Sequence, residues 1–212
     1  MPKKYESLAN ITEGDLVERL MNNRHWRGRF IGGLQGIPSD VVHHLQVPLN
    51  KAPGSPSGDI DILLIPPGCP EQCIAIEVKR VKVSSSTFKN GIPNKLQELE
   101  KARRQANLLA KIGFAQVYCF ILVVVDSRTN NSDPHSYDGL TTELATMINA
   151  AITTEGLDQR VGLIHFEFVQ SINDEPLGSG TYGGHLKRLA LGISQPSEIT
   201  TWASGLVAVR NA

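Results

Sequence analysis

The sequence predicts an α/β fold with a mixed β-sheet in three layers, and three observations carry that prediction. Apolar residues recur at helical spacing in two stretches, Glu13 to Asn23 and Asn94 to Gly113. Between them stand two short β-rich runs, Asp59 to Ile65 and Cys73 to Val81. After them comes Val117 to Val125, an apolar run that indicates a strand buried on both faces. Helices and strands in this order pack as helices on the faces of one sheet.

The length and composition fit one globular domain without a membrane segment. A chain of 212 residues suits one substantial core, and an apolar share of 41% is not low enough for disorder. The polar stretch Met1 to Asn10 lacks the apolar centre of a secretory signal, and Val117 to Val125 is too short to span a bilayer. Three cysteines form no metal-ligand pattern and fit reduced thiols. We therefore expect a cytoplasmic protein with no membrane partner.

The first helix is expected over Glu13 to Asn23. Thr12 followed by Asp15 resembles a capping box at its start. The apolar stripe that follows consists of Leu16, Val17, Leu20 and Met21. After this helix, one strand is expected near His44 to Leu49, followed by Asn50 to Gly58, a loop rich in Pro, Gly and Ser.

The next two strands are expected to pair with each other. Asp59 to Ile65 ends at Pro66-Pro67-Gly68, and Cys73 to Val81 follows closely. A short connection of this kind predicts an antiparallel pair. Lys82 to Pro93 is polar and is expected to form a loop.

The second half of the chain begins with the longer helix. Asn94 is a good N-cap residue and Gly113 is a natural residue for ending the helix. The stripe between them consists of Leu96, Leu99, Ala102, Ala106 and Leu109. After the buried strand, we expect an appended helix over Gly139 to Ile152 and a strand over Gly162 to Val169. Beyond Gln170 the signals are weak.

Charged side chains in the two central strands share sheet faces. Residues two apart in a strand point the same way, so Glu77 lies beside Lys79, and Asp59 lies beside Asp61. The residues between them are apolar, and an unpaired charge in such a strand is expensive. Either motif alone is typical of exposed cross-strand ion pairs. Together, on adjacent strands, they predict carboxylates and a lysine that converge and that a divalent cation would compensate.

Phosphodiester hydrolysis needs groups of this kind. Mg²⁺ keeps several waters and prefers one or two carboxylates as ligands. Such a metal polarises the phosphate, lowers the pKa of a bound water and offsets charge in the transition state. A lysine beside it can position or help deprotonate the attacking water. The strands therefore predict Mg²⁺ or Mn²⁺ as the cofactor.

The two strand motifs resemble those of a known family. Gly58-Asp59-Ile60-Asp61-Ile62-Leu63-Leu64, followed by Ile74-Ala75-Ile76-Glu77-Val78-Lys79, is similar to the PD-(D/E)XK nuclease superfamily, above all to its resolvase-like and restriction-endonuclease-like branches. No proline precedes the acidic residue here. The resemblance covers Thr12 to Asp126 and implies a restriction-endonuclease-like core of helix, three strands, helix and strand. Residues 127–212 would extend the same single domain.

The resemblance also implies a role for each matching strand residue. Asp61 and Glu77 would bind the metal, with the Val78 carbonyl assisting. Lys79 would be the catalytic lysine. Asp59 is the other candidate for the key ligand on its strand, and the resemblance favours the second acid, Asp61.

The two helices would add one side chain each. The family often adds a glutamate from the first helix, for which Glu18 is the better candidate and Glu13 the second. A solvated helix position remains the alternative for Glu18. Gln105 matches a glutamine that faces the site in several branches, although Leu109 stands where one such branch has a tyrosine.

Basic residues are concentrated around the second helix. Between Lys79 and Lys111, nine basic residues stand against two acidic ones, although the net charge of the chain is zero. Such segregation creates a local positive field. The expected contacts to nucleic acid are Arg80, Lys82, Lys101, Arg103, Arg104, Arg24 and Arg27. Trp26 could stack on a base, or it could be a half-buried residue at the end of a helix.

These observations predict a divalent-metal-dependent nuclease, a hydrolase of phosphodiester bonds, that acts on nucleic acid and above all on DNA. Its role would lie in restriction, defence, recombination or repair. Cleavage of both strands would favour a homodimer, because one site cuts one strand. Two alternatives stay open: a catalytically inactive binding or structural member of the same fold, and an unrelated metal-binding or small-molecule enzyme.

Overall fold

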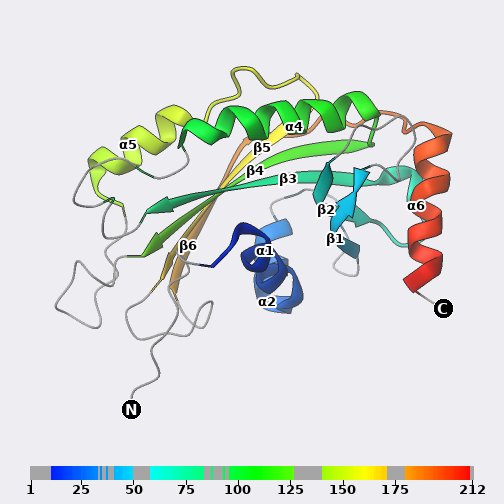
Figure 1. Ribbon diagram of the computed structural model, residues 1–212, viewed down its shortest axis with the longest axis horizontal. Coiled ribbons are helices and arrows are strands. Elements are labelled where there is room, and N and C mark those ends of the chain that lie inside the picture. Colours follow the sequence, from blue (N-terminus) through cyan, green and yellow to red (C-terminus); the bar gives the residue numbers. More distant parts are fainter. Residues whose placement is uncertain are drawn as a thin grey trace, which may run out of the picture.

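The computed structural model describes residues 11–32, 34, 37, 41–49, 58–83, 87, 93, 96–126, 140–170 and 180–210. They form a six-stranded mixed β-sheet with helices on both faces (Figure 1). The strands are β1 (Val42–Pro48), β2 (Asp59–Ile65), β3 (Ile74–Val83), β4 (Gln116–Asp126), β5 (Val161–Gln170) and β6 (Gly180–Arg188). Their order across the sheet follows their order along the chain. The predicted α/β fold with a mixed sheet is therefore confirmed.

The direction of each strand follows from the length of the connection before it. β1 and β2, β2 and β3, and β5 and β6 pair antiparallel, whereas β3, β4 and β5 run parallel. Parallel neighbours need a crossover, which α4 (Leu99–Ile112) supplies between β3 and β4. α5 (Thr142–Ala151) supplies the crossover between β4 and β5. The predicted antiparallel pairing of β2 with β3 is confirmed.

An apolar core lies on each face of the sheet. Side chains alternate along β4, so Val117 belongs to the core beneath α4 and Tyr118 belongs to the core on the opposite face. The opposite face is covered by α1 (Glu13–Asn22) and α2 (Arg24–Ile31), which Figure 1 shows below the sheet while α4 and α5 lie above it. Both faces of the central strands are therefore shielded from water.

The C-terminal part of the chain joins the same sheet and the same core. β5 and β6 extend the sheet beyond β4. The last helix, α6 (Ser197–Arg210), packs Ile199 and Ala203 into the core on the α4 side. Among the described helices, none is long and apolar enough to cross a bilayer.

The first two helices are separated by one capping residue. The Thr12 hydroxyl accepts a hydrogen bond from the Asp15 backbone N–H at 3.1 Å, so α1 begins where the sequence predicts. Asn23 follows α1, and its side chain accepts hydrogen bonds from the backbone N–H groups of His25 and Trp26. A second helix therefore starts at once. The sequence did not predict α2, because Asn23 also fits the end of a helix.

The longer helix starts later than the sequence predicts. It opens with a 3₁₀ turn, η3 (Leu96–Glu98), and α4 follows from Leu99. The predicted N-cap residue, Asn94, lies outside the described residues. Most of the two expected loops, Asn50 to Gly58 and Lys82 to Pro93, lies outside them as well. Gly113 ends α4 with a φ of 101°, a conformation that favours glycine, so this end is confirmed.

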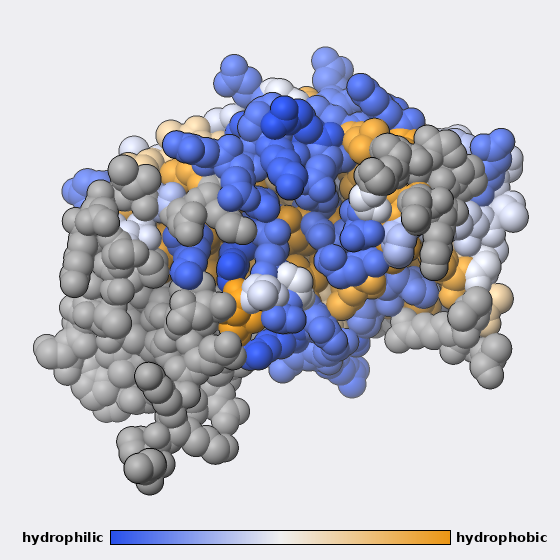
Figure 2. Space-filling model, viewed as in Figure 1, coloured by the Kyte–Doolittle hydropathy of each residue, from blue (hydrophilic) through white to orange (hydrophobic). Residues whose placement is uncertain are grey.

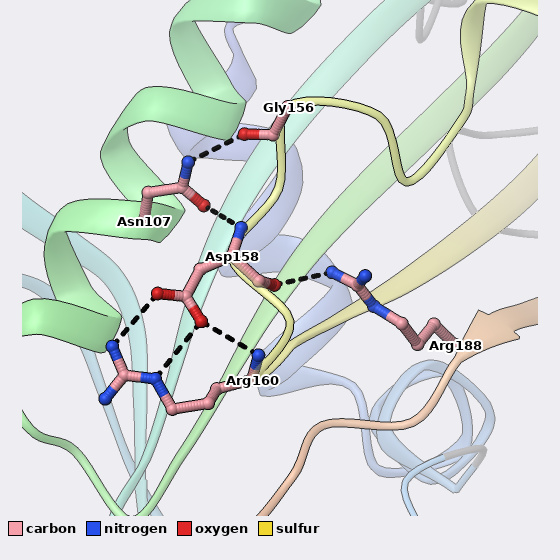
Figure 3. Close-up of polar contacts among 5 residues, drawn as sticks. All are labelled: Asn107, Gly156, Asp158, Arg160 and Arg188. Carbon is pink, nitrogen blue, oxygen red and sulfur yellow. Dashed lines mark hydrogen bonds and ion pairs between the residues drawn. The ribbon is translucent and has the colours of Figure 1, made fainter.

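One polar cluster fixes the loop that enters β5 (Figure 3). The Asn107 side chain donates to the Gly156 carbonyl at 2.8 Å and accepts from the Asp158 backbone N–H at 2.7 Å. The Arg160 guanidinium lies 3.0 Å from the Asp158 carboxylate and holds the pKa of that carboxyl at about 2. Arg188 donates to the Asp158 carbonyl at 2.6 Å, so α4, this loop and β6 are tied together.

Candidate functional site

The candidate site lies where β2 separates from β3. The register between these strands ends at the pair of Ile62 and Ile76, while β3 continues to Val83 beside β4. Asp61 is the next residue on β2, and its Oδ2 accepts a hydrogen bond from the Val78 backbone N–H at 2.8 Å. The carboxylate therefore occupies the place of the carbonyl that a continuing β2 would offer.

Gln46 on β1 holds the other oxygen of Asp61. Its Nε2 donates to Asp61 Oδ1 at 3.1 Å. Among the residues that the structure describes, Gln46 is the one non-glycine residue with a positive φ, of 49°. Gln46 and the facing Asp61 are both left out of the register of β1 with β2, between the pairs of Leu45 with Ile62 and Val47 with Ile60. Strained backbone of this kind persists where the surroundings impose it, and it clusters at functional sites. Sequence reasoning missed Gln46, because a local departure from strand backbone geometry leaves no pattern in the residues.

Glu77 lies beside Asp61 and is almost fully buried. It alternates with Ala75 and Val81, which belong to the core beneath α4, so its carboxylate faces that helix. Burial, together with the nearby charges of Asp61 and Glu13, raises the pKa of Glu77 to about 9. Burial also raises the pKa of Asp61, although the hydrogen bonds from Val78 and Gln46 act in the opposite direction. The half-buried Asp61 and the buried Glu77 thus lack enough nearby positive charge to keep both ionised at their ordinary pKa.

Lys79 is held between two carboxylates from different elements. It is 8% exposed, and its Nζ lies 3.3 Å from Glu13 Oε1 and 3.3 Å from Glu98 Oε2. Burial by itself would lower the pKa of Lys79, but Glu13 and Glu98 outweigh it, and the pKa is raised. Lys79 is therefore a protonated ammonium at neutral pH. Glu98 was not a candidate from the sequence, because it lies far from the strand motifs along the chain.

The structure favours Glu13, not Glu18, as the acid from the first helix. Glu13 is the first residue of α1, and its Oε2 accepts from the Arg80 backbone N–H at 2.5 Å. Glu18 is exposed on the same helix. Five residues turn a helix by well over a full circle at 3.6 residues per turn, so the two side chains lie on different faces. The structure thus places Glu13, the second candidate, against β3 and Glu18 away from it, a choice that the sequence could not make because it does not show which turn of α1 meets β3.

Asp59 and Gln105 occupy different positions relative to this site. Asp59 is exposed at the start of β2, opposite Pro48, and Asp61 is the residue that reaches β3. Gln105 is half-buried on α4, one turn after Lys101, whose charge acts on Glu77. Asp61, Glu77, Val78 and Lys79 are thus brought together, whereas Asp59 is not, and Gln105 lies on the neighbouring helix.

Two of the arginines predicted to contact nucleic acid form hydrogen bonds within the protein. Arg80 is buried and donates to the Ile11 carbonyl. Arg103 donates to the Ala151 carbonyl at 2.7 Å and pairs with Glu100 at 3.3 Å. Both side chains tie elements of the fold together, and neither occupies the exposed position that was expected of a phosphate contact.

The other basic candidates differ in how accessible they are. Lys101 and Arg104 are exposed on α4, and Arg24 is exposed on α2. Lys82 is half-buried, and Arg27 donates to the Met21 carbonyl at 3.1 Å. Figure 2 shows hydrophilic residues gathered over the upper part of the molecule, where α4 runs. Of the exposed basic candidates, Lys101 on α4 is close enough to Glu77 for its charge to lower the pKa of that carboxyl.

Trp26 is a core residue. Its ring is 5% exposed and packs edge-on against Phe168 at 4.9 Å and Tyr182 at 5.5 Å. The Arg29 guanidinium lies over the Tyr182 ring, 5.0 Å from its centre. Of the two expectations for Trp26, the structural one agrees with the geometry, since a base has no face of this ring to stack on.

Within the described part of the chain, no three His, Cys, Asp or Glu side chains form a ready metal cluster. Mg²⁺ needs fewer protein ligands than that, because it keeps several waters. His43 and His44, adjacent on β1, also gain no third ligand there.

Comparison with known proteins adds no family to this geometry. No protein-family model matches the chain, and no curated protein matches its sequence. Among solved structures, the chain is similar to the SPO1766 protein of unknown function from Silicibacter pomeroyi, at 11% identity and a TM-score of 0.37. That similarity covers 95% of this chain and 90% of the other.

Proposed function

We propose that this chain is a divalent-metal-dependent nuclease of the PD-(D/E)XK type, acting on nucleic acid and above all on DNA. The observation that carries the proposal is the convergence of Asp61, Glu77 and Lys79 where β2 leaves β3. A restriction-endonuclease-like core is part of the same proposal. Its support is the order of elements from α1 through β1, β2, β3 and α4 to β4.

The donor set at this site fits a hard divalent cation. Glu77 is buried and Asp61 is half-buried, and the pKa of each carboxyl is raised, mainly by desolvation, so each is electrostatically unfavourable as a carboxylate without a counter-ion. Carboxylate and carbonyl oxygens are the ligands of Mg²⁺ and Mn²⁺. Asp61, Glu77 and the Val78 carbonyl would hold the ion, and Glu13 is the nearest further acid. When bound, the ion supplies a polarised phosphate and a more acidic water.

Lys79 would act as a fixed cation. Its ammonium has three N–H donors, and Glu13 and Glu98 accept from it at 3.3 Å. The remaining donor can orient a water or a phosphate oxygen. Because Lys79 stays protonated, its contribution would be to place the water and stabilise negative charge, and another group would take the proton.

The inactive alternative shares the fold and the basic surface. A binding protein without chemistry would still use Lys101 and Arg104 to contact phosphates. It would have no need for Gln46, whose strained backbone directs an amide to Asp61. That strain favours the catalytic proposal.

A matched pair of glutamates on α1 tests the proposal. Wild type, Glu13→Gln and Glu18→Gln would be incubated with supercoiled plasmid, single-stranded DNA, RNA and branched DNA, with Mg²⁺, Mn²⁺ or a chelator. We expect metal-dependent cleavage by the wild type and by Glu18→Gln. Glu13→Gln should be slower by roughly a hundredfold, as expected for loss of one electrostatic contribution at a site.

The substrate panel also decides among the alternatives. Cleavage confined to one substrate would name the class of nucleic acid. Salt-sensitive binding without cleavage of any substrate would support the inactive alternative. Equal rates for Glu13→Gln and Glu18→Gln would remove α1 from the site.

A further inference from the structure

Glu98 stands outside both strand motifs and yet touches the lysine of the site. It is the last residue of η3 and immediately precedes α4. Its Oε2 lies 3.3 Å from Lys79 Nζ, and its side chain is 47% exposed, whereas that of Lys79 is 11% exposed. The ion pair thus joins a half-exposed carboxylate to a nearly buried ammonium.

We propose that Glu98 is a positioning residue that, with Glu13, fixes the direction of the Lys79 ammonium at the candidate site. This inference rests on the proposed nuclease function. It gives Glu98 a role at the site, although Glu98 belongs to neither strand motif.

The geometry gives the two carboxylates different tasks. Glu13 approaches from α1 and is bound to the Arg80 backbone N–H as well, so it is anchored to β3. Glu98 approaches from the start of α4, on the opposite face of the sheet. A lysine has a flexible four-carbon stem, and a single ion pair leaves it several rotamers. Contacts from two sides remove that freedom, and they leave one N–H donor for the reacting groups.

The charge of Glu98 also sets how it should affect kinetics. A carboxylate beside the site repels a phosphate, so its loss should not weaken substrate binding. Its loss should release Lys79 from a single orientation, and misplacement of about 1 Å at a reacting centre can cost up to a hundredfold in rate. A positioning role therefore predicts a lower kcat with an unchanged or lower KM. If Glu98 had only a structural role, its substitution would lower stability without lowering kcat at an unchanged or lower KM.

The chain offers a matched control two residues away. Glu100 has the same side chain, lies in the first turn of α4, and pairs with Arg103 at 3.3 Å and not with Lys79. Glu98→Gln and Glu100→Gln therefore remove the same charge from the same helix end. Both substitutions keep the size of the side chain.

The experiment has two arms on the full chain. In the first, cleavage of plasmid with Mg²⁺ is measured for wild type, Glu98→Gln and Glu100→Gln. We expect kcat of Glu98→Gln to fall by roughly tenfold to a hundredfold with KM unchanged or lower. Glu100→Gln should match the wild type. An unchanged kcat for Glu98→Gln in a protein that cleaves overturns the proposal.

The second arm does not depend on cleavage. Acylation of lysines by a neutral reagent is followed by mass spectrometry, and Lys101 serves as reference in the same sample. Loss of the ion pair with Glu98 should release the Lys79 side chain from its single orientation and let its amine reach the solvent, so Lys79 should react severalfold faster than in Glu100→Gln. Equal rates in both variants overturn the proposal. If the wild type cleaves nothing, the nuclease function fails, and this arm still decides whether Glu98 holds Lys79.

Discussion

Two polar regions of this protein differ in whether their charged groups are neutralised by partners in the folded chain. In the cluster at the entry to β5, Asp158 is paired with Arg160, and the remaining donors and acceptors meet each other (Figure 3). At the candidate site, the half-buried Asp61 lies beside the buried Glu77, and the pKa of each is raised. In the first region the charged groups are neutralised by partners in the folded chain, whereas the second has an excess of acidic groups over nearby cations. Such an excess is expected where a protein binds a cation and performs chemistry.

Removing the lysine of the charged site should have the largest effect. Lys79→Ala leaves Glu13, Glu98 and the two strand acids without their shared cation. Metal-dependent cleavage should fall by about 10²- to 10³-fold, as for loss of one electrostatic stabiliser. The measurement is single-turnover cleavage of plasmid, with Lys111→Ala as the control, since Lys111 is exposed at the end of α4. Retention of full activity would show that Lys79 has no part in the chemistry.

The two regions should respond to pH with opposite signs in a chelator. The pKa of Glu77 is about 9 in the folded protein against 4.5 ordinarily, so the folded state holds a proton that the unfolded chain has lost. The free energy of unfolding should therefore fall as pH rises from about 5 to 9, by at most about 1.4 kcal/mol per pH unit. Asp158, with a pKa of about 2, instead contributes stability above its ordinary pKa and loses it as pH falls toward 2.

Urea unfolding across pH measures both signs. Glu77→Gln carries no titrating group, so its stability should change less between pH 5 and 9 than that of the wild type. Asp158→Asn should lose the dependence near pH 2 to 4 and keep the one at higher pH. A wild-type slope between pH 5 and 9 that survives in Glu77→Gln would contradict the assignment of that slope to Glu77.

A substitution in the satisfied cluster should affect stability alone. Asn107→Ala removes hydrogen bonds to Gly156 and Asp158 at 2.8 and 2.7 Å. We expect a loss of about 2 kcal/mol in the free energy of unfolding, from two hydrogen bonds of about 1 kcal/mol each. Cleavage below the melting temperature should equal that of the wild type. A selective loss of cleavage in the folded variant would show that this cluster also serves the site.

Substitutions of Gln46 should have the smallest effect on stability, and they distinguish backbone strain from a role in cleavage. Gln46→Gly and Gln46→Ala both remove the amide from Asp61, but only glycine relaxes at a φ of 49°. Gln46→Gly should therefore be more stable than Gln46→Ala by about 1 kcal/mol. Both should cleave more slowly than the wild type by a similar factor. Thermal unfolding and cleavage rates check the two parts, and wild-type rates in either variant would deny Gln46 a role.

The sequence predicts those features of the fold and the site that local periodicity determines. β2 and β3 follow from their β-rich runs, and the alternation of strand side chains puts Glu77 and Lys79 on one face. The antiparallel pair then brings Asp61 to them. β6 and α6 were not predicted, because glycines such as Gly183 and Gly184 weaken the strand signal and α6 has little amphipathic periodicity.

The remaining site residues depend on packing that no local pattern contains. Whether Glu13 or Glu18 meets β3 is decided by how α1 docks on the sheet. Arg80 and Arg103 are of a residue type that often binds phosphate. In the fold, however, both side chains donate to backbone carbonyls, and these contacts give them structural roles. Tertiary contacts of this kind connect residues far apart in the chain, and they become visible only in the folded structure.

Under the proposed function, the excess of acidic groups at Asp61 and Glu77 binds a divalent cation that supports cleavage. The decisive measurement is nicking of supercoiled plasmid by wild type and Glu77→Gln, compared with Mg²⁺ and with a chelator. The wild type should nick only with Mg²⁺, and Glu77→Gln should be slower by about 10²-fold or more. Full metal-dependent nicking by Glu77→Gln would contradict the claim.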